Sequence, residues 1–214
     1  MNENNYVRIT GYVDKFIYNH TAYDERFYSS FVHSQRRSGT VDDIPVIASQ
    51  YLIHKKDYAG KYVEIEGEFR SMNVRTGERS RLVLQLFVKN IRIVKVKESV
   101  NDENEIILDG FLVKNPIYRT TPNGRQIADM MIAVNRPFGR SDYIPCICWG
   151  GSAKWAENLE VGTEIFVQGR IQSREYVKKL SEVESEKRTA YEVSISKLEV
   201  IDGEERKDQV SDAE

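Results

Sequence analysis

The sequence predicts an all-β protein built from two similar halves. Three observations predict it: segments of alternating polarity recur along the chain, helical patterns are short, and the first half aligns with the second. A period of two that is rich in β-branched and aromatic residues is typical of strands. In order, the clearest predicted strands are residues 6–13, 62–69, 81–96, 105–113, 128–134, 143–149, 164–171 and 189–201.

Two short segments are predicted to be helical, residues 50–58 and 153–159. Each follows a serine that can act as an N-cap, Ser49 or Ser152. Each precedes a glycine that can close the helix, Gly60 or Gly162. Trp155 lies in the second of these helices, and we expect it to plug the bottom of the core.

The two halves repeat each other at an offset that grows from 99 to 102 residues. The aligned pairs are residues 7–12 with 106–111, 42–47 with 142–147, and 60–67 with 162–169. A period this long indicates duplicated domains rather than a solenoid. We predict domains at residues 1–98 and 103–202, followed by a short acidic disordered tail at 203–214.

Within each half the order is strand, strand, strand, short helix, strand, strand. That layout is typical of the OB-fold, a small barrel that presents strands 2–3 and two loops to oligonucleotides or oligosaccharides. A glycine inside the first strand of each half, Gly11 or Gly110, suits the sharp coil of such a barrel. We therefore predict two tandem five-stranded OB-fold barrels, each with a helix between strands 3 and 4. A two-sheet sandwich is the alternative.

The composition and the charge of the chain argue against several classes of protein. The chain of 214 residues has a net charge of −2, which argues against a strongly basic protein that coats duplex DNA. It has no run of about 18 apolar residues that could span a membrane, and its first residues do not resemble a secretory signal. Its 2 cysteines cannot form a disulfide framework, so we expect a reduced, cytoplasmic protein.

Signatures of catalysis and of metal binding are absent from the sequence. The histidines His20, His33 and His54 do not have metalloprotease spacing. The pair Cys146 and Cys148 lacks the second pair that a zinc site would need. We expect no metal, no cofactor and no enzymatic activity.

One predicted strand carries the residues that binding to unpaired bases requires. By alternation, one of its faces consists of Tyr143, Pro145, Ile147 and Trp149. The other face consists of Ile144, Cys146 and Cys148, whose small cysteines suit a narrow barrel interior. Aromatic rings on the outer face could stack on bases whatever their sequence. Alternatively, they pack under a loop or against another subunit.

Five arginines of the second half could hold phosphates. They lie in the first loop, near the turn between strands 2 and 3, and on strand 4: Arg119, Arg136, Arg140, Arg170 and Arg174. Arg170 and Arg174 are an even number of residues from Tyr176, so these three can share a face. Arginine pairs with phosphate and also lies flat on bases. The alternative is that each is a solvated surface residue.

The second half resembles the bacterial single-stranded DNA-binding protein family over about residues 104–201. The segments that carry the resemblance are, in order, 110–124 with 127–128, 132–138, 143–150 and 169–176. The first half resembles the family only through its likeness to the second. The resemblance implies OB barrels that bind single-stranded DNA without catalysis, usually in assemblies of four barrels. It places stacking aromatics at Tyr143, Trp149 and Tyr176, and near Phe138.

The chain departs from the family pattern at three places. Thr120 replaces a common aromatic residue, the connection at 137–142 is short, and the sequence lacks the long tail with a phenylalanine-ended acidic tip. We therefore do not expect partners to be recruited through a C-terminal tip. The hairpin loop at 177–188 either contacts DNA or is a solvated finger, because its glutamates offset its cations.

The resemblance predicts a nucleoid-associated homodimer with four OB-folds that binds single-stranded DNA in replication, recombination or repair. The alternatives are a primosomal replication-restart protein and an OB-fold module for protein interaction or assembly. The predicted DNA-binding residues are Arg119, Arg136, Phe138, Arg140, Tyr143, Trp149, Arg170, Arg174 and Tyr176.

The first half lacks most of the aromatic residues that are predicted to bind DNA in the second half. Ser49, Asp43 and Val74 align with Trp149, Tyr143 and Tyr176. It retains or adds other candidates around its first loop: Tyr18, Tyr23, Phe27, Tyr28, Phe31, Arg36 and Arg37. We expect the N-terminal barrel to bind DNA more weakly or to serve in assembly.

Overall fold

The computed structural model describes residues 4–54, 56–77, 79–96, 102–179 and 185–201. The predicted tail at 203–214 and the tip of the predicted hairpin loop, 180–184, lie outside the described residues. The elements of the first half are β1 (Asn5–Val13), β2 (Ile17–Ala22), β3 (Glu25–Gln35), β4 (Val41–Ser49), α1 (Gln50–Ile53), β5 (Tyr62–Thr76) and β6 (Arg79–Ile93). Those of the second half are β7 (Asn104–Leu112), β8 (Ile117–Thr120), β9 (Gln126–Arg136), η1 (Pro137–Gly139), β10 (Arg140–Trp149), α2 (Gly150–Ala156), β11 (Glu164–Lys179) and β12 (Ser185–Val200).

Each half is a closed five-stranded OB-fold barrel. In the first, β1 pairs with both β3 and β5, and β4 pairs in parallel with β6. In the second, β7 pairs with both β9 and β11, and β10 pairs in parallel with β12. The closed ladders exclude the sandwich alternative. Each half has one more strand than predicted, because β2 and β8 extend β3 and β9 as short hairpin arms.

Gly11 and Gly110 mark the positions where the first strand of each barrel passes from one partner to the other. A Cβ atom on Gly11 would lie 2.2 Å from the carbonyl oxygen of His33, and one on Gly110 would lie 2.5 Å from that of Ala133. Only glycine allows so close an approach of two backbones. These glycines, which the sequence places at the sharp coil of the first strand, therefore lie where two backbones come closest.

The two short helices differ from the predictions at their ends. Ser49 caps α1, because its Oγ accepts a hydrogen bond from the backbone amide of Tyr51. Ser152 does not cap α2, because the β9–β10 ladder runs to Trp149 and the chain turns at Gly150, with φ of 57°. Both helices end well before Gly60 and Gly162, which form the left-handed turns that lead into β5 and β11.

The interiors of the two barrels are mostly aliphatic, and the largest fully buried side chain among the described residues is Phe69, in the first barrel. Trp155 is not part of the core: 46% of it is exposed, so that prediction is wrong. The reason is the register of α2. Ala153 and Ala156, three residues apart, are fully buried, which turns Trp155 away from the barrel.

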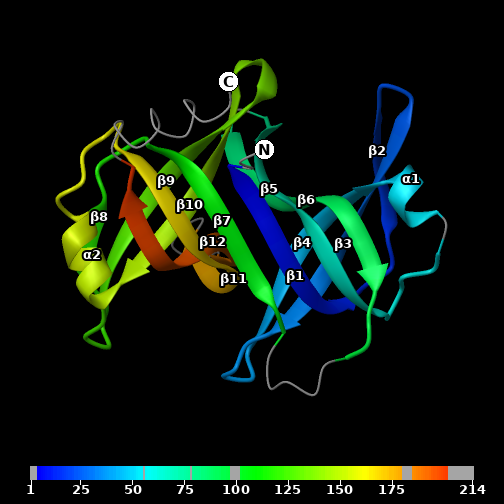
Figure 1. The fold of residues 1–214 in the computed structure, drawn as a ribbon, viewed down its shortest axis with the longest axis horizontal. Coiled ribbons are helices and arrows are strands. Elements are labelled where there is room, and N and C mark those ends of the chain that lie inside the picture. Colours follow the sequence, from blue (N-terminus) through cyan, green and yellow to red (C-terminus); the bar gives the residue numbers. More distant parts are fainter. Residues whose placement is uncertain (1–3, 55, 78, 97–101, 180–184, 202–214) are drawn as a thin grey trace, which may run out of the picture.

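The two barrels are joined edge to edge through β1 and β7, which lie at the centre of the molecule in Figure 1. These strands pair antiparallel from Asn5 opposite Leu108 to Ile9 opposite Asn104. One twelve-stranded sheet therefore runs through both barrels. The repeat is visible in detail: Asn5 exchanges side-chain hydrogen bonds with the backbone of Phe69, and Asn104 does the same with Ile171.

Two fully buried aspartates fasten the barrels to each other in a reciprocal way. Asp42 of the first barrel accepts a 2.8 Å hydrogen bond from the backbone amide of Ser173 in the second. Asp142 of the second barrel accepts a 2.7 Å hydrogen bond from the backbone amide of Ser71 in the first. Because a buried carboxylate needs compensation, each also contacts an arginine that precedes it, as described below.

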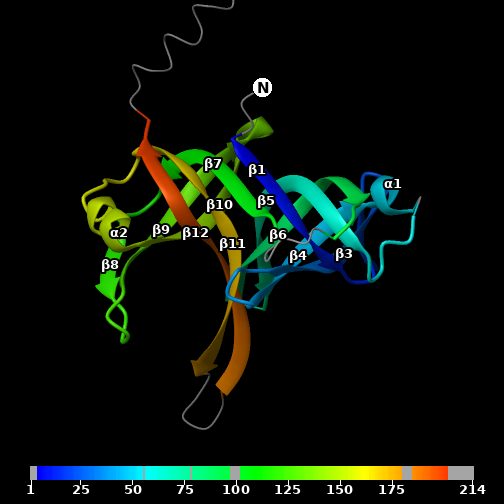
Figure 2. The same cartoon turned by 60° about the horizontal axis from the view of Figure 1, so that its bottom comes forward.

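The strands β11 and β12 continue past the barrel as a long hairpin, which extends away from both barrels in Figure 2. The alternating pattern of β11 is clearest over residues 164–171, and Arg174 is also predicted on this strand; its ladder with β12 runs to Lys179 opposite Ser185. Within the described residues no helix is long and apolar enough to cross a membrane.

His33 lies between two carboxylates at the edge of the first barrel. Its Nδ1 is 2.7 Å from Asp43 and its Nε2 is 3.1 Å from Asp14. Burial opposes the charge of the imidazolium, but these hydrogen bonds outweigh it and raise the pKa of His33. Protonated His33 therefore stabilises the fold below the unfolded-state pKa of about 6.5, and this contribution is lost as pH rises through the higher folded-state pKa.

We expect His33→Gln to remove that pH dependence. Urea unfolding of both proteins from pH 5.5 upward measures it. The difference in free energy of unfolding between wild type and variant should shrink as pH rises, and parallel profiles would contradict the role of His33.

Candidate nucleic-acid interface

The outer face of the C-terminal barrel presents aromatic rings, as the alternation along β10 predicts. Ile144, Cys146 and Cys148 point into the barrel and are at most 2% exposed, whereas Tyr143 is 44% and Trp149 is 36% exposed. Burial raises the pKa of Cys148 to about 12, so its thiol stays protonated. No group of three potential metal ligands occurs among the described residues.

Trp149 ends β10 and is held in place from one side. Its Nε1 donates a 3.1 Å hydrogen bond to the Oγ of Ser194 on β12. Ser194 in turn lies opposite Arg170 on β11 in the sheet register. The indole is therefore oriented by the barrel while part of its surface remains open to solvent, which is the arrangement that stacking on a base requires.

Tyr176 and Arg174 lie on the part of β11 that leaves the barrel. Tyr176 is 36% exposed, and the guanidinium carbon of Arg174 is 5.9 Å from the centre of its ring. This distance is within the range of a cation–π contact. Arg174 is also 3.8 Å from the carboxylate of Glu192. A ring and a cation are thus placed side by side on the hairpin.

Arg119 reaches the same face from β8. Its Nε is 2.7 Å from Asp129, and hydrogen bonding to that carboxylate raises the pKa of Arg119. About half of the Arg119 side chain is exposed. Exposed ion pairs of this kind contribute only about 0–1 kcal/mol, so a phosphate can compete with Asp129 for the guanidinium.

The turn between β9 and β10 holds the remaining candidates. Phe138 is 99% exposed and has a φ of 65°, and Arg140 is also exposed. Arg136 is placed differently: its side chain is only 25% exposed and its Nε lies 3.1 Å from the buried Asp142. Arg136 therefore belongs to the contact between the barrels and is not displayed on the same face as Trp149.

Sequence reasoning named Phe27 on the N-terminal barrel but missed Phe87 and Arg70, which form an aromatic cluster with it. The ring of Phe27 stacks on His20 at 5.1 Å and approaches Phe87 at 6.1 Å, and the guanidinium of Arg70 lies 3.8 Å from the centre of Phe87. In the parallel pairing of β4 with β6, Phe87 occupies the position that Ser194 occupies in the parallel pairing of β10 with β12. The alternation of β6 puts Phe87 outside, but the alignment compared only positions that carry rings in the second half.

Comparisons with known proteins agree with this geometry. The profile of the Single-strand binding protein family matches residues 103–201. The Single-stranded DNA-binding protein of Halalkalibacterium halodurans is 40% identical over 80 residues, which cover 34% of this chain and 48% of that protein. Single-stranded DNA-binding protein A of Bacillus subtilis is 39% identical over 80 residues, which cover 34% of this chain and 46% of that protein. The chain spans about half the length of the curated relatives it matches.

Both barrels are covered by a solved structure. The crystal structure of the wild-type single-stranded DNA binding protein from Thermus aquaticus superposes with a TM-score of 0.69 over 92% of this chain and 93% of that chain, at 18% sequence identity. At this identity the likeness shows the fold of the two barrels. Residues 103–201 therefore match the Single-strand binding protein family, within a chain whose two halves form a tandem OB-fold.

Proposed function

We propose that this chain binds single-stranded DNA without sequence preference and without catalysis. The observation that carries the proposal is the outer face of the C-terminal barrel, where Trp149, Tyr143 and Tyr176 are exposed beside the guanidinium of Arg174. Bases stack on the rings, and Arg119 and Arg174 exchange their carboxylate partners for phosphates. The named activity of the matched relatives supports the same assignment.

Binding to labelled oligo(dT) at increasing salt tests this proposal. Released counterions make log K fall with log salt by about 0.7 for each phosphate that the protein neutralises on a single strand. We expect tight binding to oligo(dT) at low salt, a linear negative slope, and much weaker binding to a duplex of equal length. Equal affinity for the duplex would contradict a site built on unpaired bases.

We further propose that the chain works in the cytoplasm on DNA exposed during replication, recombination or repair, as a homodimer with four barrels. The sheet ends in the edge strands β2 and β8, whose outer backbone groups pair with no other strand of the described residues. Such edges can add a further strand. Light scattering should give about twice the chain mass of 24.8 kDa, and a monomer at working concentration would contradict the dimer.

A further inference from the structure

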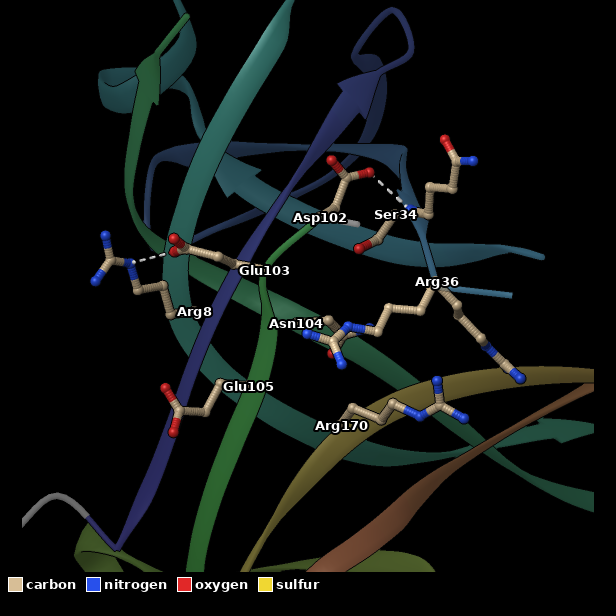
Figure 3. A pocket seen from close by; sticks show the side chains of 10 residues that line it. Arg8, Ser34, Arg36, Asp102, Glu103, Asn104, Glu105 and Arg170 are labelled. Carbon is tan, nitrogen blue, oxygen red and sulfur yellow. Dashed lines mark hydrogen bonds and ion pairs between the residues drawn. The ribbon is translucent and has the colours of Figure 1, made fainter. Parts of the chain in front are cut away.

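A pocket of about 520 Å³ lies where the two barrels meet, separate from the exposed rings (Figure 3). The pocket is lined by four arginines: Arg8 on β1, Arg36 and Arg37 just after β3, and Arg170 on β11. Figure 3 shows Arg170 facing Arg36 across the gap between the barrels. Cations from both barrels therefore meet in one cavity.

Each acidic residue of the lining has a partner, and Glu103 is paired with one of the lining arginines, Arg8. Asp102 accepts hydrogen bonds from the backbone amide of Gln35 at 2.7 Å and from the hydroxyl of Tyr62 at 2.5 Å. Glu103 lies 3.2 Å from Arg8. Glu105 accepts a 2.6 Å hydrogen bond from Gln168. None of these contacts neutralises Arg170.

Arg170 is a half-buried cation that faces another cation. No carboxylate among the described residues forms an ion pair with it. Asp42, the nearest acidic influence, receives both hydrogen bonds of Arg36, each 2.5 Å long, and also binds Ser173. Burial, and then the charge of Arg36, lower the pKa of Arg170. An anion in the pocket would relieve both effects.

The internal repeat allows Arg170 to be compared with the residue at the corresponding position of the first barrel. The ladders β5–β6 and β11–β12 are bulged at Gly67 and Gly169, which places Glu68 where the other barrel has Arg170. Glu68 binds both Arg70 and Lys89. The corresponding position of the first barrel is therefore acidic, and the fold does not require an arginine at this position.

We propose that the pocket formed by Arg36, Arg37 and Arg170 binds a backbone phosphate of a single strand that passes from the C-terminal barrel toward the N-terminal barrel. The sheet register connects the pocket to the Trp149 face, because Arg170 lies opposite Ser194 and Ser194 accepts a hydrogen bond from the indole. This inference rests on the proposed function and adds a path between the barrels.

The test compares Arg170→Gln with Lys154→Gln, which removes the same charge from the exposed surface of α2 at the far end of the barrel. Oligo(dT) binding is measured against salt concentration. Arg170→Gln should lower the magnitude of the salt slope by about 0.7 and weaken binding several-fold at low salt, whereas Lys154→Gln should match wild type. Arg37→Gln, on an exposed turn, should act like Arg170→Gln and covers the case in which the β11 variant misfolds.

The outcomes separate the two proposals. If wild type does not bind oligo(dT), the proposed function fails. If wild type binds and both arginine variants keep its slope, only the phosphate path fails. Thermal unfolding in inorganic phosphate distinguishes the source of the anion: a saturable stabilisation that Arg170→Gln abolishes, together with unchanged oligo(dT) slopes, would make this a site for free anions and overturn the proposal.

Discussion

Trp149→Ala is expected to weaken binding to oligo(dT) by roughly 5- to 150-fold, because stacking on one aromatic ring contributes about 1–3 kcal/mol per base. The indole is exposed and its orientation is set by Ser194, so the ring is ready to stack before DNA arrives. Because the salt slope reports phosphate contacts, it should remain that of wild type. Fluorescence anisotropy of a labelled oligonucleotide measures both quantities.

The chain offers a matched control in its second tryptophan. Trp155 is even more exposed than Trp149 but lies on α2, which is not one of the strands β10, β11 and β12 that form the Trp149 face. Trp155→Ala should leave the affinity unchanged. If the two alanine variants lost the same affinity, exposure of a ring anywhere on the barrel would explain binding as well as the Trp149 face does.

Asp142→Ala is expected to give the largest loss of stability, about 3 kcal/mol. The variant leaves the backbone amide of Ser71 without its acceptor and Arg136 without its counterion, at a fully buried contact between the barrels. For a chain of this size the loss lowers the thermal midpoint by roughly 6–12 °C. Differential scanning calorimetry measures it, with Glu160→Ala on the exposed surface as the control.

Asp142→Asn separates the hydrogen bond from the charge. Burial raises the pKa of Asp142 above its ordinary value despite the nearby Arg136, so the charged form is disfavoured in the folded protein. The amide oxygen of asparagine can still accept from Ser71. We therefore expect a much smaller loss than with alanine. An equal loss in both variants would show that the ion pair with Arg136, and not the hydrogen bond across the interface, fastens the barrels.

The fold could be predicted because both signals, the alternation and the internal repeat, can be read directly from the sequence. Alternation along β10 placed Cys146 and Cys148 inside and Trp149 outside, and the internal repeat gave two barrels. The wrong predictions concern features that depend on neighbours. The orientation of Trp155 follows from the burial of Ala153 and Ala156, and the start of α2 follows from the length of the β9–β10 ladder.

The sequence shows which candidate site residues are arginines, but it does not show which role each arginine has in the structure. Arg136 and Arg170 look alike in sequence, but the first lies on a buried aspartate and the second faces another arginine. The difference arises from the way in which the barrels meet, through β1 and β7 and the reciprocal Asp42 and Asp142 contacts. No periodicity within one strand reports such a contact.

Tryptophan fluorescence tests the central claim most directly. The chain has 2 tryptophans, so Trp155→Phe leaves Trp149 as the sole reporter. Titration of this variant with oligo(dT) should quench its emission to saturation, with added salt restoring the signal. Binding seen in a parallel gel shift without any change in the emission of Trp149 would place the DNA elsewhere and contradict the account.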